Sequence, residues 1–313
     1  MLKDYPLQVF SGRANPALSE AICGYLQIEM GHLRLGSFSD GEIFCQIQDN
    51  VRGADVFIVQ PTGRPANESL MELLIILDAF RRASPSRVCV VMPYMGYARQ
   101  DRKDAPRVPI TAKLVANLIT SAGADRLLTI DLHAAQIQGF FDIPVDHLYA
   151  APILIEAIRR KNLDKLVLVS PDAGGVELAS RVAMGLAGSM ALIDRHRGSP
   201  AKAKAMHLIG DVKDRDCILV DDMIDTASTL TEAADLLVTS GASSVRAAAT
   251  HAILSGSGPE RINRSKITEL IVTDSIPLPI EKQTEKISVV SVAPLLAQAI
   301  HNVHVGESVT SLS

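Results

Sequence analysis

The sequence predicts an α/β protein made of two similar lobes, each a mainly parallel sheet flanked by helices, with a small antiparallel element at an edge. Two patterns predict this fold class. Short β-branched runs alternate with longer segments of helical period, and both halves repeat one rough plan of strand, polar strand end and helix. With 313 residues and 47% hydrophobic content, the chain suits two lobes better than one large domain. We expect lobes at residues 1–148 and 149–313.

Apolar, β-branched runs mark the expected parallel strands. They lie at Leu7–Phe10, Asp55–Gln60, Arg87–Met92, Leu127–Asp131, Leu166–Ser170, Met190–Ile193, Cys217–Asp221, Val245–Thr250, Leu270–Thr273 and Ile287–Val290. Between strands, Glu68–Ser84 repeats apolar residues at spacings of three and four and predicts a helix. A second helix is expected at Thr229–Ser240, with Gly241 as its stop signal. A Ser39-Asp40-Gly41 turn inside Ser37–Val51 predicts a hairpin or antiparallel strand at the edge of the first lobe.

Composition limits the classes of partner. Lys plus Arg number 31 against 35 for Asp plus Glu, a net charge of −4, so no positive field attracts nucleic acid or anionic lipid. No stretch of about 18 apolar residues occurs, and the N-terminus lacks a signal-like apolar run, so we expect no membrane association. The four cysteines are scattered without a CxxC pair, which favours reduced thiols and a cytoplasmic location over a zinc site or disulfides.

The segment Ile218–Leu230 carries the strongest functional signal. An apolar run leads into Asp221 and Asp222, and an acid and small hydroxyl residues then precede an amphipathic helix. Ligands bind at the carboxyl ends of parallel strands, and a helix N-terminus favours an anion such as a phosphate monoester. The two adjacent carboxylates suit sugar hydroxyls or the water around Mg²⁺. The alternative is that these residues only cap the helix.

This segment resembles the ribose-phosphate-binding motif shared by phosphoribosyltransferases and by ribose-phosphate diphosphokinases, the enzymes that make phosphoribosyl diphosphate. The resemblance implies phosphoribosyltransferase-like lobes, with Asp221 and Asp222 on the ribose hydroxyls. It also implies a cradle for the 5-phosphate made by Asp225, Thr226, Ala227, Ser228 and Thr229. The family loop usually has glycine where this chain has Ser228. If the backbone needs a positive φ there, serine would cost roughly 1–2 kcal/mol.

A second motif separates enzymes that make the activated sugar from those that use it. Tyr97–Asp104, flanked by Gly96 and Pro106, mixes positive and negative charges and predicts a mobile polar loop able to fold over a polyanion. A solvated surface loop is the alternative. The string Y-A-R-Q-D-R-K-D, followed by P-I-T-A-K-L-V-A, is similar to the ATP-side loop of ribose-phosphate diphosphokinases. That resemblance implies ATP binding by Arg99, Gln100 and Asp101 and a catalytic role for Lys103.

Further segments agree with this family. By resemblance, Phe38, Asp40 and Glu42 reach the adenine of ATP in a neighbouring subunit, which implies a homo-oligomer, expected as a hexamer built from dimers. His133, just past a strand end, would be both catalytic and a ligand of the Mg²⁺ carried by ATP, although a lone histidine is more often structural. Asp172, followed by two glycines, would bind a second Mg²⁺ or a diphosphate, with an ordinary strand–helix turn as the alternative.

The resemblance implies one reaction: transfer of the β,γ-diphosphate of ATP to the C1 hydroxyl of ribose 5-phosphate, with AMP released and Mg²⁺ as cofactor. The family places a Lys and an Arg two residues apart beside the reacting phosphates, and here Arg195 and Arg197 occupy those positions. Because arginine replaces a compact donor with a planar fork, we expect turnover below the family norm. Two rivals remain: a phosphoribosyltransferase, and a non-catalytic or weakly active regulatory paralogue motivated by Arg195, Ser228 and an altered C-terminus.

Overall fold

The structure is a computed structural model that describes residues 5–196 and 205–312. The chain forms two compact units. Unit 1 consists of the described residues up to Tyr149, Ser275–Pro277, and the segment from Val292 to the C-terminal end. Unit 2 consists of the described residues of Ala150–Asp274, with Leu278–Ser291. The first crossing between units thus lies one residue after the expected boundary, but the last segment of the chain belongs to unit 1 and not to the expected C-terminal lobe.

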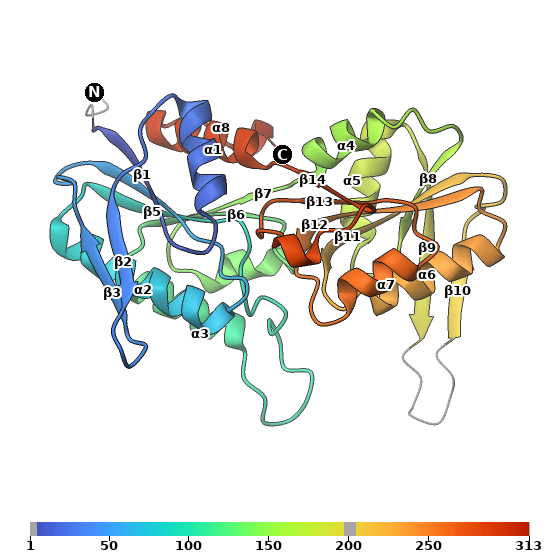
Figure 1. The fold of residues 1–313 in the computed structure, drawn as a ribbon, viewed down its shortest axis with the longest axis horizontal. Coiled ribbons are helices and arrows are strands. Elements are labelled where there is room, and N and C mark those ends of the chain that lie inside the picture. The colour runs from blue at the N-terminus through green and yellow to red at the C-terminus, as the bar shows by residue number, and fades with distance from the viewer. Residues whose placement is uncertain (1–4, 197–204, 313) are drawn as a thin grey trace. The chain divides into compact units, whose positions relative to one another are not determined.

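Unit 1 is built on a parallel sheet with the strand order β1-β4-β5-β6-β7. Helices α1 and α8 lie on one face, and α2 and α3 lie on the other (Figure 1). The elements are β1 (Leu7–Ser11), α1 (Pro16–Leu26), β2 (Leu33–Ser37), β3 (Ile43–Ile47), β4 (Asp55–Val59), α2 (Ala66–Ala83), β5 (Arg87–Met92), α3 (Thr111–Ala122), β6 (Arg126–Ile130), the 3-10 helix η1 (Ala135–Phe140), β7 (Val145–Leu148), α8 (Ala293–Val305) and the 3-10 helix η3 (Thr310–Leu312).

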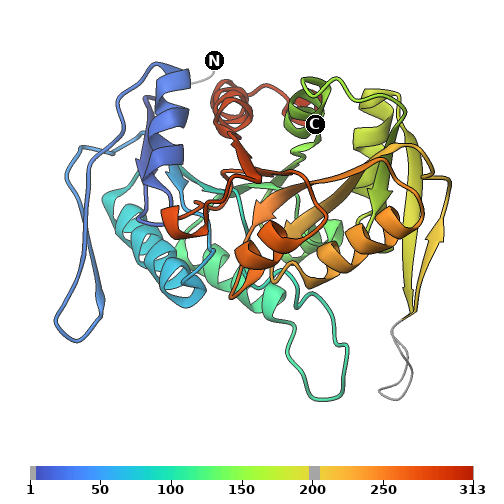
Figure 2. The same cartoon turned by 45° about the vertical axis from the view of Figure 1, so that its right-hand side comes forward.

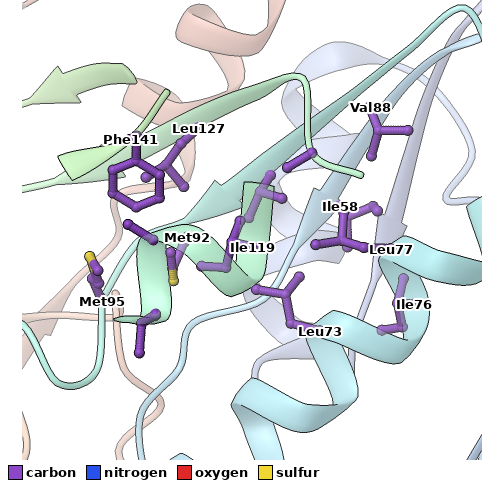
Figure 3. Close-up of a cluster of buried hydrophobic side chains, with 14 of the residues drawn as sticks. Ile58, Leu73, Ile76, Leu77, Val88, Met92, Met95, Ile119, Leu127 and Phe141 are labelled. Atoms are coloured by element: carbon purple, nitrogen blue, oxygen red, sulfur yellow. The ribbon is translucent and has the colours of Figure 1, made fainter. Parts of the chain in front are cut away.

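The core of unit 1 lies between the sheet and helices α2 and α3. The predicted apolar stripe of α2 is confirmed for Leu73, Leu77 and Phe80, which are fully buried together with Ile76. Leu70 and Leu74, also expected in the stripe, are only partly buried. Figure 3 shows this stripe facing side chains from the central strands and from α3. Strand β4 is buried along its whole length, as expected for a central parallel strand covered on both faces.

The expected antiparallel edge element is a separate hairpin. Strands β2 and β3 pair with each other in a two-stranded sheet that is not hydrogen-bonded to the parallel sheet of unit 1. Strand β3 packs on α2, and its partly buried Cys45 and Ile47 contact the main core cluster. The turn at residues 39–41 was predicted correctly, but β2 begins before the predicted segment. The hairpin is thus held by side-chain packing on a helix, which sequence alternation alone does not reveal.

Helix α8 is fixed to unit 1 by packing and by charge. It packs on α1 (Figure 1). The carboxylate of Asp55 on β4 binds Arg87, with Nε at 2.8 Å, and lies 2.8 Å from Nδ1 of His304 on α8. Arg87 also donates to the carbonyl oxygen of Val303 at 3.1 Å. This Asp55–Arg87–His304 cluster, in which Asp55 is buried, is the local reason why the chain end belongs with unit 1.

Unit 2 is built on a larger sheet with the strand order β10-β9-β8-β11-β12-β13-β14, parallel except for β10. Helices α4 and α5 pack together, and so do α6 and α7 on the other face (Figure 1). The elements are α4 (Ala151–Arg159), β8 (Leu166–Ser170), α5 (Val176–Leu186), β9 (Ser189–His196), β10 (Ala205–Ile209), β11 (Asp216–Ile224), α6 (Ser228–Thr239), β12 (Ser244–Ala252), α7 (Gly258–Arg264), β13 (Leu270–Thr273), the 3-10 helix η2 (Ile280–Lys282) and β14 (Ile287–Val290).

All the predicted parallel strands are present, and α6 begins and ends one residue before its predicted bounds. The strands that the sequence did not predict are β7 and β10, and β2 lies almost wholly before the segment predicted as a hairpin. Within the described residues, no helix combines the length and apolar character needed to cross a bilayer. The four cysteines are free thiols, and burial raises the pKa of Cys217 to about 11, so that this thiol stays protonated.

Candidate active site

The paired aspartates lie inside the last part of β11. The predicted strand ended at Asp221, whereas β11 continues to Ile224. Its pairing with β8 reaches only Leu219, while its pairing with β12 continues to Ile224. Asp221 and Asp222 therefore stand where one neighbouring strand has already ended. The carboxyl end of a parallel sheet, where neighbouring strands end at different points, is where ligands commonly bind.

The turn after β8 approaches Asp221 closely. Oδ1 of Asp172 accepts hydrogen bonds from the backbone N–H groups of Gly174, at 2.8 Å, and Gly175, at 3.3 Å. A Cβ added to Gly175 would lie 3.2 Å from the carbonyl oxygen of Val220 and 3.5 Å from Oδ1 of Asp221. Glycine at this position thus allows the turn to pack against β11. Oδ1 of Asp172 does what the alternative, an ordinary strand–helix turn, requires, because it accepts two backbone hydrogen bonds within the turn. Oδ2 accepts neither of those two bonds.

The aspartates interact electrostatically. Burial, and then the charges of Asp222 and Asp172, raise the pKa of Asp221 well above its usual value of 3.8. Carboxylates this close favour a ligand that donates hydrogen bonds or brings positive charge, because either one relieves their repulsion. Sugar hydroxyls and a hydrated divalent cation both meet that requirement.

The loop from Asp225 to Thr229 forms the start of α6. Its N-cap residue is Ala227, which has no polar side chain to cap the first turn. The alternative, that these residues only cap the helix, therefore does not hold at the N-cap position. Ala227 is buried and has a φ of 61°, whereas Ser228 is the first residue of the helix. The positive φ expected at Ser228 is thus found one residue earlier, because the chain reverses just before the helix begins. The hydroxyls of Thr226 and Ser228 lie 3.2 Å apart.

A second segment braces this loop from the side of β12. The backbone N–H of Ser255 donates to the carbonyl oxygen of Asp225 at 2.9 Å, and Arg261 Nη1 donates to that of Thr226 at 3.2 Å. A Cβ added to Gly258 would lie 3.0 Å from the Asp225 carbonyl oxygen. The sequence analysis missed Arg261 and Gly258, since they follow the loop by about thirty residues and carry no motif of their own. Their contacts fix the backbone that presents the helix N-terminus.

In unit 1, the segment from Tyr97 to Asp104 follows β5. The backbone of Gly96 donates to Thr62 Oγ1 at 2.7 Å, and Tyr97 has a φ of 66° and donates through its hydroxyl to Asn67. Beyond this anchored start, Arg99, Gln100 and Lys103 are exposed. The chain then extends as an open loop before α3, which Figure 2 shows together with the projecting β2–β3 hairpin. This exposure fits both the predicted loop that folds over a polyanion and the alternative of a solvated surface loop.

His133 lies on the segment that follows β6 and is exposed. Gln136, on η1 of the same segment, donates to Oδ2 of Asp101 at 3.0 Å. The structure thereby joins the loop that carries Arg99, Gln100 and Asp101 to the segment that carries His133. Gln136 received no role in the sequence analysis, because a glutamine in a loop gives no signal of which side chain it contacts.

The remaining residues that are predicted to bind ATP lie at the tip of the β2–β3 hairpin. Phe38, Asp40 and Glu42 are exposed, and Asp40 Oδ1 accepts from the backbone N–H of Glu42 at 3.1 Å. The Phe38 ring packs edge-on against Phe44, with centroids 5.9 Å apart. A side chain so exposed at a hairpin tip is available to a nucleobase, as the resemblance implies.

Comparison with known proteins identifies the family. Residues 7–123 match the N-terminal domain of ribose phosphate pyrophosphokinase, and residues 190–313 match the phosphoribosyl synthetase-associated domain. A ribose-phosphate pyrophosphokinase from Gloeobacter violaceus is 50% identical over 313 residues, which is 100% of this chain and 94% of that protein. The chain belongs to the ribose-phosphate pyrophosphokinase family. A relative of the same name from Bacillus subtilis is 50% identical over 309 residues, 99% of this chain and 98% of its own.

A solved structure supports the family assignment. The phosphoribosylpyrophosphate synthetase from Mycobacterium smegmatis is 41% identical and superimposes with a TM-score of 0.91 over 96% of this chain and 99% of its own. Two further residues were assigned to the site by resemblance. Arg195 pairs through its backbone with Met206 at the end of β9, and Arg197 lies outside the described residues.

The carboxylates of the candidate site suit magnesium. Over residues 5–196 and 205–312, His, Cys, Asp and Glu side chains do not gather in groups of three or more that could hold a metal ion. Mg²⁺ does not need such a cage, since it is commonly bound by one or two carboxylates together with water and substrate phosphates. Asp172 and Asp221 offer oxygen donors of this kind in unit 2, and His133 offers a nitrogen in unit 1.

Proposed function

We infer that the protein transfers the β,γ-diphosphate of ATP to the C1 hydroxyl of ribose 5-phosphate, giving 5-phosphoribosyl 1-diphosphate and AMP. The observation that carries this inference is the likeness, over the full chain, to proteins named ribose-phosphate pyrophosphokinase. The local geometry supports it. Unit 2 offers paired aspartates beside a helix start with no side-chain cap at its N-cap position, and unit 1 offers an exposed loop rich in Arg and Lys.

We propose that ribose 5-phosphate binds to unit 2. The 5-phosphate would accept hydrogen bonds from the backbone and hydroxyls of Asp225, Thr226, Ala227, Ser228 and Thr229 at the N-terminus of α6. The macrodipole of α6 and its first-turn N–H groups favour a dianion there. Asp221 and Asp222 would accept hydrogen bonds from the ribose hydroxyls. These bonds would offset the burial, and then the repulsion from Asp222 and Asp172, that raise the pKa of Asp221.

We propose that ATP binds to unit 1. Phe38, Asp40 and Glu42 would contact the adenine. Arg99, Gln100 and Asp101 would bind the rest of the nucleotide, and Lys103 and His133 would face the phosphates. His133 would hold the Mg²⁺ carried by ATP, and Asp172 would bind a second Mg²⁺ or a diphosphate. Such an ion would neutralise phosphate charge when bound. The contact between Gln136 and Asp101 supports a joint role for the loop and the His133 segment.

The chemical step is an in-line displacement. The C1 oxygen of ribose attacks the β-phosphorus of ATP, the bond from that phosphorus to the oxygen retained by AMP breaks, and the C1 hydroxyl loses its proton. Such a transfer depends on positioning and on stabilising charge at the departing oxygen. We propose Arg195 and Arg197, together with Lys103, as the side chains that supply positive charge there.

These observations weaken one rival function and leave the other as a second candidate. A phosphoribosyltransferase would share the ribose-phosphate loop, but family domains at both ends of the chain favour a ribose-phosphate pyrophosphokinase. A weakly active regulatory paralogue stays a second candidate because Arg195 stands where lysine is usual. Ser228 no longer argues for it, since that residue lies in a helix and needs no positive φ.

The deciding experiment is an assay for AMP. Purified protein is incubated with ATP, Mg²⁺ and ribose 5-phosphate, and AMP is measured together with the phosphorus spectrum of the sugar product. We expect AMP only when the sugar phosphate is present. AMP formed equally without the sugar would indicate hydrolysis, and no AMP would favour the regulatory paralogue. The homo-oligomer, expected as a hexamer built from dimers, and the cytoplasmic location stay predictions, and light scattering tests the first of them.

A further inference from the structure

The backbone that leads to His133 has an unusual conformation. Asp131 directly follows β6, is 5% exposed and has a φ of 37°, in a region that residues with a Cβ seldom occupy. Leu132 is also buried, at 8% exposure, and His133 emerges into solvent immediately afterwards. The direction of the exposed His133 side chain is therefore determined largely by the two buried residues that precede it. Such strained positions persist only when surrounding contacts hold them.

Strand β7 supplies those contacts. The backbone N–H of Asp131 donates to the carbonyl oxygen of Leu148 at 2.9 Å. The backbone N–H of Leu132 donates to Nε2 of His147 at 2.9 Å. A backbone amide in a buried turn would normally need a carbonyl partner, and here an imidazole ring takes that place.

The ring of His147 is itself held from other sides. Its Nδ1 lies 3.3 Å from Nε2 of Gln138, and its centroid lies 4.6 Å from that of Tyr149. The neighbouring Asp146 is paired with Arg126, so that carboxylate is engaged elsewhere. His147 thus contacts both ends of the stretch from Leu132 to Gln138, which contains His133.

We propose that His147 is a positioning residue for His133. Its Nε2 atom accepts the Leu132 N–H and so holds the strained turn in the one conformation that aims His133 into the ATP-side site. The proposal rests on the proposed function for the role of His133 only. The hydrogen bond and its effect on the turn can be tested whether or not the protein forms AMP.

The test compares two substitutions at position 147. His147→Leu removes the acceptor. His147→Gln keeps an acceptor, because the terminal amide oxygen of glutamine reaches about as far from the backbone as Nε2 does. Should the leucine variant fail to fold, His147→Phe keeps a ring against Tyr149 and removes both nitrogens. His304→Leu is the control, since His304 is another partly buried histidine of unit 1 and binds Asp55 instead.

The first readout is hydrogen–deuterium exchange of the peptide that contains Leu132. We expect exchange of the Leu132 amide to become about 10- to 100-fold faster in His147→Leu, as the hydrogen bond is lost, and to stay near wild type in His147→Gln. The His304→Leu control should leave this exchange unchanged even if its melting temperature falls. Unchanged exchange in His147→Leu would overturn the proposal.

The second readout is the kinetics of AMP formation. We expect kcat to fall about 10-fold or more in His147→Leu, with KM for ribose 5-phosphate unchanged because that substrate is assigned to unit 2, and to recover in His147→Gln. Equal losses in the leucine and glutamine variants would mean that the acceptor is not what matters, and would overturn the proposal. If wild-type protein forms no AMP, the proposed function fails while the exchange experiment still decides the role of His147.

Discussion

Ala227 adopts the left-handed conformation that the sequence had suggested for Ser228. A residue with a Cβ in that conformation costs roughly 1–2 kcal/mol, and glycine avoids the cost. We expect Ala227→Gly to raise the free energy of unfolding by about 1 kcal/mol, measured by urea denaturation. The matched Ser228→Gly change should lower it, because Ser228 lies in the first turn of α6. Equal effects of the two changes would contradict the assignment of the turn.

Asp221, which we propose binds the ribose hydroxyls, carries a cost in stability. Because its pKa is raised in the folded protein, protonation of this carboxyl stabilises the fold. That contribution to the free energy of unfolding is complete below the unfolded pKa near 3.8 and is lost as pH rises through the folded pKa. We expect Asp221→Asn to melt at a higher temperature than wild type at pH 8 without ligands, with the difference shrinking towards pH 4. The same variant should lose roughly 100-fold or more in activity. A variant less stable than wild type at pH 8 would argue against a raised pKa of Asp221 in the folded protein.

Arg195 is the departure with the clearest expected effect on rate. A compact ammonium suits a tight phosphate site better than the broad guanidinium fork. We expect Arg195→Lys to raise kcat by a few-fold in a steady-state assay of AMP release, with stability unchanged. A lysine variant equal to or slower than wild type would show that arginine is not a handicap here.

At the scale of elements, the Asp55–Arg87–His304 cluster attaches α8 to the sheet of unit 1. The Asp55 side chain is 4% exposed, and neutralising it leaves Arg87 without its charged partner. Removing one member of a buried ion pair commonly costs about 3–5 kcal/mol. We expect Asp55→Asn to lower the free energy of unfolding by about 3 kcal/mol in urea, with α8 becoming accessible to proteolysis first.

The control for this prediction lies on α2. Asp78 and Arg82 form an ion pair of similar geometry, 2.7 Å long, on the exposed surface of that helix. Water and salt screen such a pair, so we expect Asp78→Asn to change stability very little. If both substitutions had the same effect, burial would not be what makes the Asp55 cluster matter.

Sequence patterns predicted the elements that are locally specified. Strand β4 was predicted because its residues are apolar on both faces, and α2 because its apolar residues recur with helical period. Strand β7 was missed, since Val145–Leu148 is short and half polar. This segment forms a strand because it pairs with β6, and it contains His147, which contacts Leu132.

At the scale of the whole molecule, the two substrate sites are assigned to different units. Asp221 belongs to unit 2 and His133 to unit 1. We expect Asp221→Asn to abolish the calorimetric heat of ribose 5-phosphate binding while ATP with Mg²⁺ still binds. His133→Ala should weaken ATP binding about 10-fold or more and leave the sugar phosphate unaffected. Loss of both ligands in either variant would contradict independent sites.

The sequence by itself determined the fold class, the alternation of strands and helices, and the family, because periodicity and motifs are local properties of the chain. Only the tertiary structure decided that residues from Val292 onward belong to unit 1, that Arg261 contacts the loop before α6, and that His147 accepts the N–H of Leu132. Each of these depends on a contact between residues 15 or more positions apart. Such partners are chosen by burial and by the need to satisfy buried polar groups, which no local pattern records.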